Sequence, residues 1–111
     1  MASENKTNEP KEDGTDLATE EEVKIEKPRL YRVVLINDDY TPMEFVILVL
    51  TNIFRKTQEV AERLMMEIHT KGSGVCGVYP YDTARTKVYQ VKTIAKKQGH
   101  PLECLMEVVD S

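Results

Sequence analysis

The chain has 111 residues and a formal net charge of −4, a length that suits one domain. Residues 1–28 contain nine acidic and four basic side chains, so residues 29–111 hold the remaining ten acidic and eleven basic ones and are almost neutral. A neutral body without a basic patch argues against nucleic acid and against a membrane surface as partners. No apolar run is long enough to cross a bilayer, and we expect no signal peptide.

The first 28 residues are rich in Glu, Lys, Thr and Asn and almost free of large apolar side chains. Such a composition cannot bury enough apolar area to offset the entropy of ordering, so it predicts a flexible acidic N-terminal extension. Residues 29–111 form the predicted core domain. Its two cysteines, Cys76 and Cys104, have apolar neighbours, which favours free buried thiols and a cytoplasmic protein.

Residues 30–36 are mostly aliphatic and predict a buried strand. Three polar residues at 37–39 follow it. Thr41, Pro42 and Glu44 then match a capping box with proline at the first helical position, which predicts that Thr41 is the N-cap of a helix and that the turn is rigid.

Periodicity and breaker residues define the other elements. They are a helix continuing to Phe54, a second helix capped by Thr57 and ended by Gly72, a strand at 75–79, a third helix from Tyr81 or Asp82 to Gly99, and a strand at 102–109. This order predicts an α+β fold, a compact two-layer β-α-α-β-α-β domain with a three-stranded antiparallel sheet packed against helices.

The turn at 37–39 carries three adjacent side chains that accept hydrogen bonds next to hydrophobic residues. On a rigid loop, this combination suits a small cation attached to an apolar group, such as the α-amino group of a bulky amino acid. Asn and Asp also favour solvated turns before helices, so chemistry alone leaves a structural role open.

Five groups of residues spread over positions 30–108 carry a resemblance to a known family. They are Val34 to Val46, Leu64-Met65 with Ile68-His69, Cys76-Gly77-Val78, Ala84 with Thr86-Lys87-Val88, and His100-Pro101-Leu102 with Cys104. Together they closely resemble the ClpS adaptor family, which brings N-degron substrates to the ClpAP protease. The resemblance implies a non-enzymatic adaptor domain without cofactor or metal.

The resemblance further implies that the chain binds a free N-terminal Leu, Phe, Tyr or Trp and delivers its substrate to the N-terminal domain of a ClpA-type AAA+ unfoldase. An ammonium leaves water only when its protons find acceptors. The implied α-amino ligands are Asn37, Asp38 and an unprotonated nitrogen of His69. The implied hydrophobic pocket, between the first turn and the second helix, comprises Thr41, Met43, Val46, Met65, Ile68 and Leu102.

The remaining implied roles concern the loop, selectivity and docking. Asp39 supports the loop, and Met43 resembles a gatekeeper that rejects first residues branched at Cβ. The unfoldase docks at the start of the third helix, through Asp82, Ala84 and Lys87. Arg85 stands where the family pattern predicts an acidic residue. The N-terminal extension is implied to be engaged by the unfoldase pore, and we expect the chain to be a monomer.

Other functions remain as alternatives to the adaptor. Cys76 with His69 suggests a small cysteine hydrolase, although an apolar strand raises a thiol pKa. A zinc site from both cysteines and both histidines lacks paired ligand spacing, and the carboxylates at 38–39 lack the alternation of a calcium loop. A structural interaction domain resembling a ribosome-stalk protein has the same predicted architecture. The charges at Asp82 and Lys87 could also be a solvated helix face.

Overall fold

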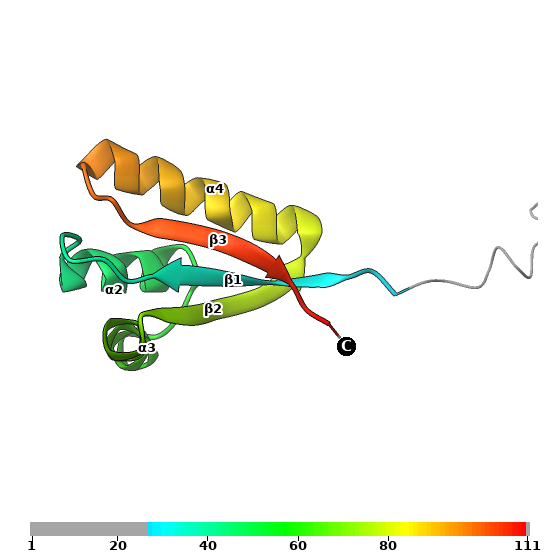
Figure 1. Cartoon of the computed structure of the whole chain (residues 1–111), viewed down its shortest axis with the longest axis horizontal. Coiled ribbons are helices and arrows are strands. Elements are labelled where there is room, and N and C mark those ends of the chain that lie inside the picture. The colour runs from blue at the N-terminus through cyan, green and yellow to red at the C-terminus, as the bar shows by residue number, and fades with distance from the viewer. Residues whose placement is uncertain (1–26, 111) are drawn as a thin grey trace, which may run out of the picture.

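The computed structural model describes residues 27–110 of the chain (Figure 1). All but the last two residues of the predicted flexible extension, 1–28, lie outside the described part. The elements are β1 (Leu30–Ile36), α2 (Met43–Asn52), α3 (Gln58–Lys71), β2 (Ser73–Pro80), α4 (Tyr81–Gln98) and β3 (Glu103–Val108). Their order and types confirm the predicted β-α-α-β-α-β sequence.

The three strands form one antiparallel sheet in the order β2-β1-β3, with the first strand of the chain in the centre. Tyr31 pairs with Tyr79 of β2 on one side and with Val108 of β3 on the other. Figure 1 shows α4 running along the sheet, with α2 behind the strands and α3 beside β2. The predicted α+β fold with a three-stranded antiparallel sheet is confirmed.

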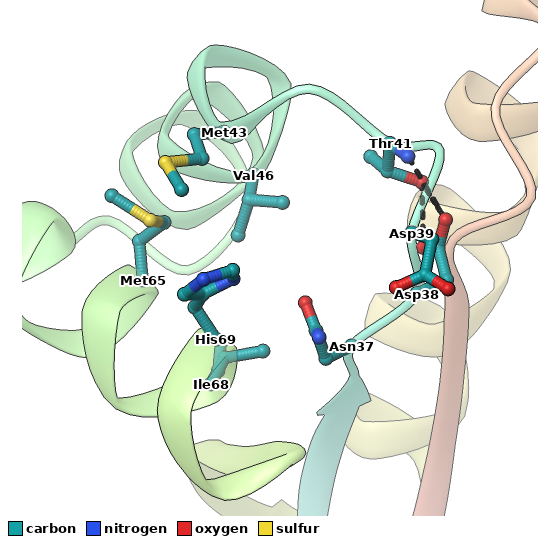
Figure 2. Close-up of a pocket in the computed structure, with 9 residues that line it drawn as sticks. All are labelled: Asn37, Asp38, Asp39, Thr41, Met43, Val46, Met65, Ile68 and His69. Carbon is teal, nitrogen blue, oxygen red and sulfur yellow. Dashed lines mark hydrogen bonds between the residues drawn. The ribbon is translucent and has the colours of Figure 1, made fainter.

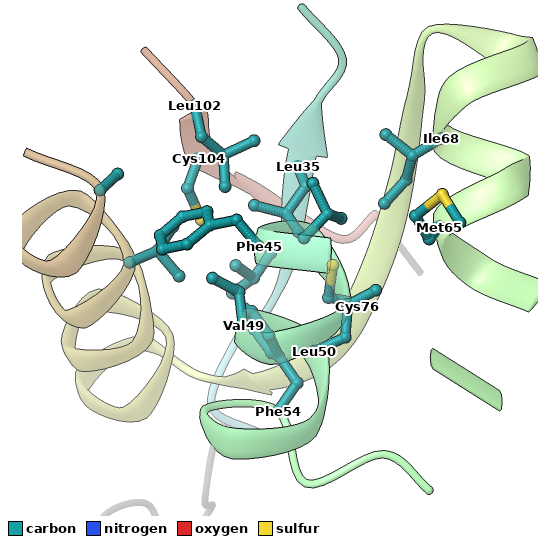
Figure 3. Close-up of a cluster of buried hydrophobic side chains, with 14 of the residues drawn as sticks. Leu35, Phe45, Val49, Leu50, Phe54, Met65, Ile68, Cys76, Leu102 and Cys104 are labelled. Atoms are coloured by element: carbon teal, nitrogen blue, oxygen red, sulfur yellow. The ribbon is translucent and has the colours of Figure 1, made fainter. Parts of the chain in front are cut away.

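One hydrophobic core lies between the sheet and the helices (Figure 3). Val33 and Leu35 of β1, Val49 and Leu50 of α2, and Val91 of α4 are completely buried in it. Burying a side chain of this size contributes about 1.5–3 kcal/mol, so these contacts fix how the helices lie on the sheet.

The start of α2 differs from the prediction. The N-cap is Pro42, whose carbonyl accepts hydrogen bonds from the amides of Phe45 and Val46, and no side chain caps the helix. The predicted capping box at Thr41 is therefore wrong. The Thr41 hydroxyl instead donates to the carboxylate of Asp38, at 2.7 Å, because that acceptor lies within the same turn.

The ends of the other two helices agree with the sequence. Thr57 caps α3 by accepting a hydrogen bond from the amide of Val60 at 3.2 Å. Gly72 ends α3 and Gly99 ends α4, with φ of 94° and 75° respectively. These left-handed conformations are readily adopted only by residues without a Cβ, which is why glycine stands at both positions.

Candidate functional site

A cavity of about 190 Å³ opens between the loop after β1, the first turn of α2 and the last turns of α3 (Figure 2). An engineered cavity of about 150 Å³ holds a benzene molecule, so this one has room for a phenyl ring. The lining residues are Asn37, Asp38, Asp39, Thr41, Met43, Val46, Met65, Ile68 and His69.

The cavity brings Asn37 and His69 together from two separate elements. The backbone amide of Asn37 donates to the carbonyl of Gly72 at 2.9 Å, and the amide of Gly72 donates to the carbonyl of Ile68 at 2.9 Å. These two bonds join the end of β1 to the end of α3. Figure 2 shows both side chains pointing toward the same space. The predicted acceptor pair therefore shares one pocket.

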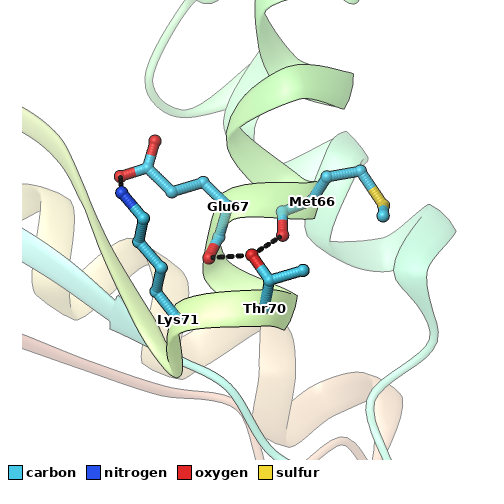
Figure 4. Close-up of polar contacts among 4 residues, drawn as sticks. All are labelled: Met66, Glu67, Thr70 and Lys71. Carbon is cyan, nitrogen blue, oxygen red and sulfur yellow. Dashed lines mark hydrogen bonds and ion pairs between the residues drawn. The ribbon is translucent and has the colours of Figure 1, made fainter.

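The last turn of α3, which carries His69, has further support (Figure 4). The hydroxyl of Thr70 donates to the carbonyls of Met66 and Glu67, at 2.9 and 3.3 Å. Lys71 forms an ion pair with Glu67 at 3.9 Å, four residues earlier on the helix. The bonds of Thr70 are the i−4 and i−3 contacts that a threonine hydroxyl makes inside a helix, and the ion pair joins positions i and i+4, so His69 lies in a regular last turn of α3.

The deep part of the pocket is apolar. Val46, Met65 and Ile68 are buried, and they come from two helices that pack against each other. Met43 lies at the opening and exposes 45% of its surface. Polar acceptors thus lie beside an apolar interior, with a flexible side chain at the entrance.

Asp38 does not present a free carboxylate to the pocket. Its Oδ2 accepts hydrogen bonds from the backbone amides of Tyr40 and Thr41, both at 2.9 Å, and its Oδ1 accepts from the Thr41 hydroxyl. Partial burial raises the pKa of Asp38, but the bonds from Thr41 and Tyr40 together lower it by more, and the pKa lies below its ordinary value. We call this arrangement the Asp38 turn.

The Asp38 turn changes two predicted roles. Asp39 is exposed, and among the hydrogen bonds of residues 27–110 none involves its side chain. The loop support expected of Asp39 is therefore provided by Asp38, because an aspartate at this position reaches amides two and three residues ahead. Asp38 lines the pocket, as predicted, but with its oxygens already occupied.

Leu102 was predicted to line the pocket, and the structure places it elsewhere. It is 5% exposed and belongs to the hydrophobic core, where Figure 3 shows it near Cys104. The cavity ends before reaching this side chain. The residue precedes β3, on the far side of the central strand from β2 and α3.

The predicted docking residues on α4 differ in exposure. Asp82 is exposed, whereas Ala84 is completely buried and cannot contact a partner, so its predicted role is wrong. A small side chain at Ala84 lets α4 lie close to the sheet. The ammonium of Lys87 donates to the carbonyl of Ile53 at 2.7 Å and lies 5.8 Å from the ring centroid of Tyr79.

Sequence reasoning missed three contacts that shape these regions. One is the bond from Asn37 to Gly72, and another is the inward bond of Lys87. The third is the close approach of Gly74 to Ile68, since a Cβ at Gly74 would lie 2.7 Å from Ile68 Cγ1. For the first and third contacts, the only signal in the sequence is the Gly-Ser-Gly run at 72–74. This run indicates a turn, but it does not show which residues the turn contacts.

The alternative of a cysteine hydrolase is contradicted. Cys76 is 1% exposed, and burial, followed by the proximity of Cys104, raises the pKa of its thiol to about 12. A nucleophile needs an accessible thiolate, and this thiol is neutral and enclosed. Within residues 27–110, no three potential ligand side chains gather as a metal site would require. None of the helices in this part of the chain is long and apolar enough to span a membrane.

Comparisons with known proteins agree with this geometry. Residues 26–105 match the family model of the ATP-dependent Clp protease adaptor protein ClpS. The ATP-dependent Clp protease adapter protein ClpS of Hyphomonas neptunium is 54% identical over 101 residues, which cover 89% of this chain and 86% of the relative. That of Maricaulis maris is 56% identical over 96 residues, with 86% and 88% covered.

A solved structure is also similar. It is Agrobacterium tumefaciens ClpS2 bound to L-phenylalaninamide, which superimposes with a TM-score of 0.73 at 42% sequence identity. The match covers 75% of this chain and all of that one.

Proposed function

The chain belongs to the ClpS family of Clp protease adaptors, and from this premise we propose that its pocket binds proteins with a free N-terminal Leu, Phe, Tyr or Trp. The adaptor then delivers them for degradation and performs no chemistry itself. The observation that carries the proposal is the convergence of Asn37 and His69 over an apolar cavity.

The pocket matches both halves of an N-terminal residue. A protonated α-amino group has three hydrogen-bond donors and no acceptor. The side-chain oxygen of Asn37 and an unprotonated ring nitrogen of His69 can accept two of its hydrogen bonds. A peptide carbonyl or a water molecule at the open side of the pocket can accept the third. The side chain of the first residue enters between Val46, Met65 and Ile68.

Neither half is sufficient alone. Complete burial of a Leu or Phe side chain contributes about 1.5–3 kcal/mol, whereas micromolar binding needs about −8 kcal/mol. The charged hydrogen bonds of the ammonium must supply much of the rest. This division predicts that the ligand needs both a free amine and a large apolar side chain.

The ligand of the Agrobacterium relative has the same two parts. L-phenylalaninamide combines a free α-amino group with a phenyl ring, and its amide stands where a peptide bond would continue. By similarity, the cavity of about 190 Å³ in this chain takes the ring, and the amine lies at Asn37 and His69. Met43 at the opening disfavours Val and Ile as first residues because they are branched at Cβ.

Delivery requires a second partner, which we propose to be the N-terminal domain of a ClpA-type unfoldase in the cytoplasm. Asp82 supports this role because it is exposed at the start of α4. Lys87 contributes by holding the end of α2 through Ile53, in addition to its charge. We propose that the adaptor acts as a monomer with the acidic segment 1–28 as its extension and 29–111 as its core.

Fluorescence anisotropy with two labelled peptides tests the binding proposal. Both begin with Leu, and one is N-acetylated. We expect the free peptide to bind with micromolar or tighter affinity and the acetylated peptide to lose binding, since acetylation removes the charge and two donors. Equal affinity for the two peptides would refute recognition of the amine. Peptides beginning with Gly or Ser serve as controls for the apolar part.

A further inference from the structure

The outward face of α4 carries an excess of positive charge. The helix contains five basic residues and one acidic residue, Asp82. Two ion pairs occur among residues 27–110, Arg32–Glu107 and Lys71–Glu67, and neither involves α4. Lys92, Lys96 and Lys97 in its second half are all exposed. This helix is basic in a chain whose net charge is −4.

A groove of about 400 Å³ runs along the same helix, where it meets the end of α2. Ile53 and Ile94 are half-buried in it, and Tyr89 beside them is 69% exposed. Lys97 lies at one end of the groove, and the half-buried Lys87 is fixed to the carbonyl of Ile53. The groove therefore combines apolar contact surface with nearby cations, which fits a segment that is both acidic and apolar.

The chain itself contains such a segment. Residues 16–26 have the sequence DLATEEEVKIE, with five acidic residues, one lysine and three large aliphatic residues. We propose that residues 16–26 bind the groove between α4 and the end of α2, with the acidic side chains facing Lys97, which lines the groove, and the exposed Lys96 next to it. The aliphatic residues Leu17, Val23 and Ile25 contact the apolar part of the groove.

The attachment point allows this contact. The start of β1 and the start of α4 lie at the same end of the molecule, where the rings of Tyr31 and Tyr81 are 5.4 Å apart (Figure 1). From Tyr81 to Ile94 the helix rises about 20 Å, and ten extended residues span about 33 Å. A covalently attached segment has an effective concentration on the order of millimolar, so weak contacts are sufficient.

Other occupants fit less well. A second copy of the chain would bring two basic helices together, which repel each other. A nucleic acid would meet the positive helix but also the net negative charge of the whole chain. The intramolecular segment satisfies both the charge and the apolar surface.

Paramagnetic relaxation enhancement in the full chain tests the proposal. A nitroxide is attached at Ala18→Cys in a ¹⁵N-labelled protein. Burial raises the thiol pKa of both Cys76 and Cys104 to about 12, so the reagent modifies the new thiol selectively. We expect strong broadening of amides from Tyr89 to Lys97 and none along α3. Raising salt from about 0.1 M to about 1 M shortens the Debye length from about 10 Å to about 3 Å and should remove much of the effect.

A charge exchange supplies the matched controls. Glu20→Lys, Glu21→Lys and Glu22→Lys together should abolish the broadening, whereas Glu4→Lys, Glu9→Lys and Glu12→Lys make the same charge change outside the proposed segment and should leave it. Combining the first triple with Lys96→Glu and Lys97→Glu should restore it. These lysines are exposed, so the folded state tolerates their replacement.

Three results would overturn the proposal. Broadening spread evenly over the surface would mean that residues 16–26 have no preferred site. Broadening of α4 in a mixture of spin-labelled unenriched chain and unlabelled ¹⁵N chain would assign the groove to a second copy. Shifts of α4 amides with oligothymidylate, without broadening by the nitroxide, would make this face a surface for polyanions.

Discussion

The pocket and the outward face of α4 use polar groups in opposite ways. In the loop beside the pocket, both oxygens of Asp38 are bound by groups of the same turn. On α4, none of the five cations forms an ion pair with a carboxylate of residues 27–110. Polar groups that are paired internally hold a shape, and polar groups that are not paired remain available for a ligand.

The same contrast exists inside the pocket. The Asp38 turn fixes the loop, and the bond from Asn37 to Gly72 fixes the backbone next to the end of α3, whereas the side chains of Asn37 and His69 make no hydrogen bond with another side chain of residues 27–110. Preorganised acceptors lose little entropy when a ligand binds. The adaptor can therefore recognise a small ammonium group on a domain with a modest core.

The largest expected effect comes from the free acceptors. His69→Ala should weaken binding of a Leu-initiated peptide by about ten- to a hundredfold, because a hydrogen bond to a charged group is worth about 1.5–3 kcal/mol. Anisotropy titration measures the change. Arg63→Gln, six residues earlier on the exposed side of α3 and outside the pocket lining, is the matched control and should bind like the parent chain. If both variants bound equally, His69 would not be an amine ligand.

The second effect concerns the entrance. Met43→Ala should raise the affinity for peptides that begin with Val or Ile several-fold, because removal of an obstructing side chain relieves overpacking worth about 1–3 kcal/mol. The affinity for Leu peptides should fall slightly, through lost contact. Leu48→Ala, also exposed on α2 but outside the pocket, provides the control. Unchanged discrimination against Val and Ile would remove Met43 from the selectivity argument.

The third effect tests the close contact behind the pocket. Gly74→Ala should lower the free energy of unfolding by about 1–3 kcal/mol, because the new methyl group lies 2.7 Å from Ile68 Cγ1 and Ile68 must move. Thermal denaturation followed by circular dichroism measures the loss, and peptide affinity should fall with it. Ser73→Ala on the neighbouring residue should be nearly neutral. A stability equal to that of the parent chain would show that Ile68 relaxes without cost.

The smallest effect is on pH dependence. The folded-state pKa of Asp38 is lowered, so the Asp38 turn contributes its stability above the ordinary pKa of about 3.9 and loses it as the pH falls through the folded value. The difference in unfolding free energy between the parent chain and Asp38→Asn should be constant from neutral pH to about pH 5 and shrink below about pH 4. Urea titrations at several pH values measure it. A difference that grew in acid would reverse the assigned sign.

Much of the site was predicted because its residues match the sequence pattern of the ClpS family, and local patterns placed those residues on a polar turn and on a helix. Asn37 and Asp38 end an aliphatic strand, and Met65, Ile68 and His69 follow one face of a helix ended by a glycine. Eight of the nine residues that line the pocket, all except Asp39, were predicted as ligand or wall residues, and Leu102, the ninth residue predicted for these roles, is not part of the lining. Leu102 was assigned to the pocket by the resemblance, and the local sequence does not show whether its side chain faces the cavity or the core.

Local pattern could not resolve which of several neighbouring polar groups pairs with which. By sequence, Thr41 fits a helix cap, in which its oxygen accepts from an amide of the first turn, yet its hydroxyl donates to the carboxylate of Asp38 three residues earlier and no side chain caps the helix. Lys87 was predicted only as a docking residue, and the structure adds a hydrogen bond from its ammonium to the carbonyl of Ile53 at the end of α2. Both outcomes depend on atoms that come together only in the folded turn or between helices.

By itself, the sequence determined the elements, their order, the buried faces and the chemical character of the pocket, since these follow from periodicity, glycine conformations and side-chain type. Only the tertiary structure decided that the end of β1 bonds to the end of α3, that Ala84 is enclosed and that no cation of α4 forms an ion pair with a carboxylate of residues 27–110. The physical reason is range: propensity acts over a few residues, whereas hydrogen bonds and charge pairs act between groups that are distant in sequence and adjacent in space.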